Sequence, residues 1–114
     1  MRILLSLTAA LALMGCGGAS YSKVTGPPQR VSTTSVALRN IAFSPSAIQV
    51  APGATVQFTN NDGIAHNVTF SDGSITGATD FSTGSRSVVL PVAPGTYAFH
   101  CTIHPGMTGS VLVQ

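Results

Sequence analysis

The chain has 114 residues, of which only 7% are charged, and its formal net charge is +2. This length suits one domain rather than two, and so weak a positive charge argues against a protein that binds nucleic acid. Frequent Gly and Pro, with Val, Thr and Phe in short runs, favour many short strands joined by tight turns.

The N-terminal residues have the composition of an export signal. A short positive region, Met1-Arg2, precedes an apolar run over 3–14 that is too short to span a bilayer. The sequence Leu-Met-Gly-Cys that ends at Cys16 resembles the lipobox of bacterial lipoproteins, in which the signal is cut before a cysteine that then carries a lipid. We therefore expect a signal peptide over 1–15 and lipidation of Cys16, with a plain secretory signal as the alternative. Gly17 after the cysteine favours the outer membrane by the same resemblance.

Residues 17–35 lack apolar periodicity and are rich in Gly, Ser, Thr and Pro. We interpret 16–35 as a lipid-anchored flexible tether, about 25 Å long as a coil, with a stub of no function as the alternative. Export also makes the second cysteine, Cys101, informative. If Cys16 is acylated, Cys101 has no disulfide partner, and an unpaired thiol in an oxidising compartment indicates a metal, a reactive nucleophile or an intermolecular bond.

Short apolar runs begin at Val36 and continue to the end of the sequence. We predict strands at 36–43, 47–51, 55–60, 66–70, 86–90, 96–101 and 110–114, separated mostly by turn residues such as Pro-Gly and Asp-Gly. Seven short strands in about 80 residues predict one all-β domain over 36–114, built as an antiparallel sandwich.

Strand direction predicts which residues meet at one end of such a sandwich. If 55–60 runs upward, His66 opens the next descending strand at the top. If the turn at Pro94-Gly95 lies at the bottom, the following strand brings Cys101 to the same top end. With these directions the strands 66–70 and 86–90 both run downward. Residues 71–85 must therefore carry the chain upward between them.

The side chains expected at that end are suited to a metal. Strand alternation faces Cys101 inward and His100 outward, so His100 is not expected to be a ligand. The remaining candidates are His66, Cys101, His104 and Met107, and the spacing Cys-x2-His-x2-Met suits a tight loop around one point. Zinc is seldom bound by Met, and calcium and magnesium prefer oxygen. Two imidazoles, one thiolate and a thioether match a mononuclear blue copper centre.

Two segments together resemble a known family. FTNNDGIAHNVTF, residues 58–70, followed by PGTYAFHCTIHPGMTGSVLV, residues 94–113, resembles the cupredoxins, particularly the plastocyanin/amicyanin group. The resemblance covers about 36–114, and the short loop between Cys and Met is closer to amicyanin. It implies a Greek-key antiparallel β-sandwich of about seven to eight strands that holds one copper ion, cycling between Cu(I) and Cu(II).

The resemblance also implies a role for each site residue. His66, Cys101 and His104 would be the strong ligands, and Met107 the weak axial one. In such proteins the Asn after the first His ties the ligand loops together by hydrogen bonds. The supporting residues here would be Asn67 and Thr102. The loop His presents its ring edge through an apolar patch, and the electron-exit surface here would comprise His104, Ile64, Ala65, Pro105 and Gly106.

These features predict a blue copper electron-transfer protein rather than an enzyme. We expect it to be a monomer that exchanges single electrons with transient protein partners at the periplasmic or cell-surface face of a bacterial membrane. A copper chaperone or storage protein on the same fold is the main alternative, and reversible one-electron cycling with intense visible absorption would exclude it. A thiol enzyme using Cys101 and His104 is a second alternative, and protection of Cys101 from alkylation by bound metal would exclude that.

Overall fold

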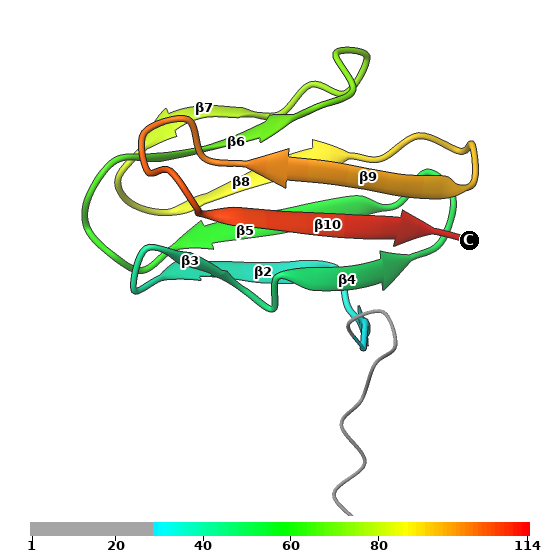
Figure 1. Cartoon of the computed structure of the whole chain (residues 1–114), viewed down its shortest axis with the longest axis horizontal. Coiled ribbons are helices and arrows are strands. Elements are labelled where there is room, and N and C mark those ends of the chain that lie inside the picture. The colour runs from blue at the N-terminus through cyan, green and yellow to red at the C-terminus, as the bar shows by residue number, and fades with distance from the viewer. Residues whose placement is uncertain (1–28) are drawn as a thin grey trace, which may run out of the picture.

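A computed structural model describes residues 29–114 of the chain, which form ten strands in two packed sheets (Figure 1). The strands are β1 (Val31–Ser32), β2 (Ser35–Arg39), β3 (Ala42–Ser44), β4 (Ala47–Val50), β5 (Thr55–Asn60), β6 (His66–Phe70), β7 (Ala78–Phe81), β8 (Ser85–Val89), β9 (Gly95–His100) and β10 (Thr108–Val113). One sheet has the order β1-β4-β10-β9-β6-β7 and the other β3-β2-β5-β8. Between residues 29 and 114 no helix has the length and apolar character needed to cross a membrane.

The all-β sandwich expected from the sequence is confirmed, but its strand pairing is mixed. The pairs β1–β4, β4–β10 and β2–β5 are parallel, and the remaining neighbours are antiparallel. The prediction of a purely antiparallel sandwich missed these three pairs. Their cause is the path of the chain, which crosses from one sheet to the other after β1, β3, β4, β5, β7 and β8. Such crossings place strands of the same direction side by side.

The predicted strand 36–43 is broken into a hairpin. Leu38 pairs with Phe43 and Arg39 with Ala42, so the turn between β2 and β3 consists of Asn40 and Ile41 alone. Both turn residues have positive φ, 53° and 54°, as a two-residue hairpin turn with matching twist requires. A β-branched residue such as Ile rarely adopts this conformation, which is why the residue types did not indicate a turn here.

The segment 71–85 contains a strand that the sequence analysis left open. β7 runs antiparallel to β6, with a register irregularity between His66 and Val68. It carries the chain back toward the end where His66 lies, as the direction argument required. Gly77, just before β7, permits the close approach, since a Cβ there would lie 1.9 Å from the carbonyl oxygen of Val68.

The ordered domain begins earlier than predicted. The expected tether reached Ser35, whereas Val31–Ser32 form β1 and pair with β4. Arg30 also donates to the carbonyl oxygen of Ile48 and to the hydroxyl of Ser110. The predicted start of the domain at Val36 is therefore too late. The predicted signal peptide, Cys16 and most of the tether lie outside the described residues.

A cluster of four phenylalanines forms the centre of the core. The ring of Phe99 lies 4.9 Å from that of Phe43 and 5.4 Å from those of Phe58 and Phe70, measured between centroids. Gly109 faces it across the β9–β10 pair, and a Cβ at Gly109 would lie 2.5 Å from the Phe99 ring. This packing fixes the last part of β9, directly before Cys101.

Candidate metal centre

Three connections meet at one end of the sandwich (Figure 1). The β5–β6 connection ends at His66, the first residue of β6, and the β9–β10 loop starts with Cys101. The β2–β3 turn lies at the same end. The β9–β10 loop closes on itself, because the amide of Cys101 donates to the carbonyl oxygen of Met107 and the amide of Met107 donates to that of His104. These two hydrogen bonds give the loop a defined shape.

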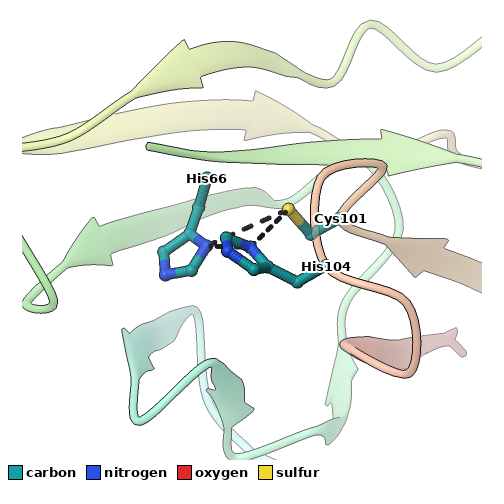
Figure 2. Close-up of side chains that lie close together, drawn as sticks. All are labelled: His66, Cys101 and His104. Atoms are coloured by element: carbon teal, nitrogen blue, oxygen red, sulfur yellow. Dashed lines mark hydrogen bonds between the residues drawn. The ribbon is translucent and has the colours of Figure 1, made fainter. Parts of the chain in front are cut away.

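The structure brings three of the predicted donors together (Figure 2). His66 Nδ1 lies 3.1 Å from His104 Nδ1. Cys101 Sγ lies 3.9 Å from His66 Nδ1 and 3.7 Å from His104 Nδ1. His66 and Cys101 are buried, whereas His104 is partly exposed. Two distant segments thus direct two nitrogens and a sulfur toward one point.

Two further predictions concern residues of the same region. Met107 is buried at the end of the loop that carries Cys101 and His104, and its role as the axial ligand stays a prediction. His100 lies in β9, paired with Thr108 of β10, and is not part of the donor group found among residues 29–114. The outward orientation expected for His100 agrees with its partial exposure.

The donor set suits copper. Imidazole nitrogen and thiolate sulfur are the ligands that copper sites for electron transfer use, in a trigonal arrangement of two His and one Cys. Both histidines present the same ring nitrogen, Nδ1, to the common point. The other ring nitrogen of His66 is already engaged by Asp62. The residues present therefore fit a copper ion bound by Nδ1, Nδ1 and Sγ.

Asn67 connects the two ligand segments by hydrogen bonds. Its side-chain oxygen accepts from the amide of Thr102 at 3.0 Å and its side-chain nitrogen donates to the Thr102 hydroxyl at 2.7 Å. Its backbone amide donates to Cys101 Sγ at 3.5 Å. The bonds predicted between Asn67 and Thr102 are thus present. They hold the start of β6 against the end of β9.

Two carboxylates next to the site were not anticipated. Asp80, on β7, accepts a hydrogen bond from the side chain of Asn67 at 2.9 Å. Asp62 contacts His66 Nε2 at 2.7 Å, and this hydrogen bond, followed by that from the Ile41 amide, lowers the pKa of Asp62 below its ordinary value. The chain contains only three acidic residues. This scarcity was the signal that could have drawn attention to them. Asp62 lies four residues before His66, and Asp80 lies in the segment that had to return to the same end of the sandwich.

Exposed apolar residues lie on the connections at the same end of the sandwich as the partly exposed His104. The other residues predicted for the electron-exit surface, Ile64, Ala65, Pro105 and Gly106, are all exposed. Two more exposed isoleucines belong to the same end of the molecule, Ile103 beside His104 in sequence and Ile41 in the β2–β3 turn. The backbone of Ile41 reaches this region by donating to Asp62. Sequence reasoning missed Ile41 because it belongs to the other sheet.

A β-sandwich that directs two imidazoles and a thiolate to one point is a copper-binding architecture. The family model described as copper binding proteins, plastocyanin/azurin family, matches residues 30–114. The chain belongs to this family, and copper is its cofactor.

Relatives and solved structures agree with this placement. Amicyanin-alpha of Methylorubrum extorquens is 33% identical over 114 residues, covering 96% of this chain and 89% of that protein. Chloroplastic plastocyanin of Pisum sativum is 37% identical over 88 residues, covering 65% of this chain and 52% of that protein. The chain thus spans about half the length of such chloroplastic plastocyanins.

Solved structures share the fold. The Cu(I) form of an amicyanin variant aligns with a TM-score of 0.64 at 25% identity, covering 76% of this chain and 87% of that one. A purple cupredoxin from Nitrosopumilus maritimus aligns with a TM-score of 0.62 at 24% identity, covering 70% of this chain and 98% of that one, which supports the fold alone. The cupredoxin resemblance seen in the sequence is confirmed.

Proposed function

We propose that this chain is a blue copper electron-transfer protein that passes single electrons between transient protein partners in the cell envelope. The observation that carries the proposal is the convergence of His66 Nδ1, Cys101 Sγ and His104 Nδ1 within a buried end of the sandwich. When bound there, copper supplies a one-electron couple between Cu(I) and Cu(II).

The protein's own contribution is a fixed, shielded set of donors. His66 and Cys101 are buried, which keeps bulk water from them. The hydrogen bonds of Asn67 hold the two ligand segments together, so the donors keep their places when the charge of the site changes. If Met107 is the fourth ligand, a bound copper ion would have no coordination position left for a substrate. For this reason we propose that the chain is not an enzyme.

The face around His104 is the proposed route for electrons. His104 is the only one of the three convergent donors that is partly exposed. Exposed Ile41, Ile64 and Ile103 lie at the same end, and a small apolar surface of this kind suits a short-lived complex between a monomer and its partner. Because the chain carries few charges, we expect docking to depend little on salt.

One experiment tests the function directly. We expect the protein to bind one equivalent of Cu(II), to absorb visible light intensely, and to cycle reversibly by one electron in voltammetry. A protein that binds copper without cycling, and surrenders it readily to a competing chelator, would support the alternative of a copper chaperone or storage protein. The buried thiolate argues against this alternative, because handing over copper requires an accessible site.

Replacing Met107 by Leu tests the axial ligand. Leu is close to Met in volume and is tolerated in cores at a cost below about 1.5 kcal/mol. We expect the variant to retain copper and to have a higher reduction potential, since a weak donor that favours Cu(II) is lost. Voltammetry of both proteins provides the measurement. An unchanged or lower potential would count against ligation by Met107.

We further propose that the protein is exported and held by a lipid on Cys16, with the periplasmic or cell-surface face of the outer membrane favoured. The support is the sequence alone, in the apolar run and the Leu-Met-Gly-Cys that ends it. The residues between Cys16 and the first strand at Val31 would then serve as the tether through which the anchored domain reaches its partners.

A further inference from the structure

We propose that Asp62 is a positioning residue for the metal centre, which fixes His66 with Nδ1 free for copper and joins this ligand to the β2–β3 turn. The inference concerns the copper site of the proposed function and rests on it. Its basis is one carboxylate that accepts hydrogen bonds from a ligand of one sheet and from a turn of the other.

The contacts of Asp62 use both of its oxygens. Oδ2 lies 2.7 Å from His66 Nε2 and 3.0 Å from the amide nitrogen of Ile41. Oδ1 lies 2.6 Å from the amide nitrogen of Asn40. The side chain of Asp62 is 14% exposed and that of His66 is fully buried. The contact with the imidazole is therefore well shielded from water, which strengthens it.

The backbone of Asp62 is also held in place. Its amide donates to the side-chain oxygen of Asn60 at 2.9 Å. The side-chain nitrogen of the buried Asn60 donates in turn to the carbonyl oxygens of Ile64 and Phe81. The side chain of Asn60 thus holds the β5–β6 connection at Asp62 and at Ile64, and ties it to Phe81 of β7. Asp62 reaches His66 from a rigid position rather than from a mobile loop.

The chemistry of this contact decides which nitrogen of His66 can bind a metal. An ionised carboxylate only accepts hydrogen bonds, so the bond at Nε2 requires the proton to be on that nitrogen. In neutral His66 the other nitrogen, Nδ1, then carries a free lone pair. Nδ1 is the nitrogen that faces Cys101 and His104. Asp62 therefore selects the tautomer in which His66 is ready to bind.

The same carboxylate compensates an unfavourable turn. Asn40 and Ile41 both have left-handed backbone conformations, and for Ile this is costly. The backbone amides of these two residues both donate to Asp62, which is the only side chain in the described part of the chain that accepts from them. Removing the carboxylate would leave these amides without that acceptor and free the turn, whose exposed Ile41 lies at the same end of the sandwich as His104.

Asp62→Asn tests the proposal, because it keeps the size of the side chain and removes its charge. Asp72→Asn is the matched control. Asp72 is exposed, bonds only to Ser74, and follows β6 at its far end from His66. We expect the Asp62 variant to have a higher reduction potential than the Asp72 variant, since a negative charge near the metal favours Cu(II). Its copper-free form should also unfold at a lower temperature.

The tautomer of His66 provides a readout that needs no copper. Nitrogen NMR of the copper-free protein, recorded above the ordinary pKa of histidine, should show His66 protonated at Nε2 in the natural sequence and a mixture of tautomers in the Asp62 variant. Protonation of the natural protein at Nδ1 would overturn the proposal, as would equal potentials for the two Asn variants. If the natural protein fails to cycle by one electron while His66 keeps the Nε2 proton, the proposed function fails and the positioning role stands.

Discussion

Replacing Cys101 by Ser is expected to abolish the intense visible absorption of the copper-loaded protein. The absorption requires a thiolate bound to copper, and Cys101 Sγ lies 3.9 Å from His66 Nδ1 and 3.7 Å from His104 Nδ1. Serine has nearly the same shape but offers a hydroxyl that is a poor ligand for copper. Optical titration of both proteins with Cu(II) measures the effect.

The other cysteine of the sequence, Cys16, provides the matched control. A Cys16→Ser variant of the same protein removes the other sulfhydryl, and we expect it to retain the visible absorption in full. A Cys101→Ser variant that remained intensely coloured would refute thiolate ligation and with it the blue copper assignment. Loss of colour in both variants would show that the two cysteines act together, which the proposed site excludes.

Replacing Phe99 by Ala is expected to lower the free energy of unfolding by about 3–5 kcal/mol, the usual cost of removing a buried aromatic ring. Phe99 is buried at the centre of the aromatic cluster, with Phe43, Phe58 and Phe70 around it. Gly109 has no side chain that could fill the space left by the ring. The surroundings therefore collapse poorly, which places the expected loss in the upper part of the range.

Urea unfolding of the copper-free protein measures this loss without the additional stability that a bound metal supplies. Tyr97→Ala is the control, because Tyr97 is the preceding residue on the same face of β9 but is only partly buried, with its hydroxyl bonded to the exposed carbonyl oxygen of Ala93. We expect a clearly smaller loss there. A Phe99 variant that loses less than about 1 kcal/mol would contradict the central role of the ring, since ordinary substitutions already cost that much.

Most strands could be predicted because apolar alternation and turn residues are local signals. The strands at 55–60 and 66–70 were predicted at the bounds that the structure has, and six of the other elements overlap predicted ranges, β2 and β3 sharing one range. The missed elements lack such signals. β1 has two exposed residues and exists only by pairing with β4, and β7 lies in a polar segment held by β6. The break at Asn40 and Ile41 depends on a carboxylate 21 and 22 residues away.

The sequence by itself determined the donor types, their spacing and the end of the sandwich where they meet. The direction of each strand follows from the number of turns before it, and the face on which a side chain lies follows from its position along the strand. Only the tertiary structure decided what supports the donors. The hydrogen bonds of Asp62 with His66 and with the Ile41 amide, and that of Asp80 with Asn67, join strands or sheets whose pairing follows from packing. No local pattern encodes that packing, since the chain crosses between sheets repeatedly and the parallel pairs arise from those crossings.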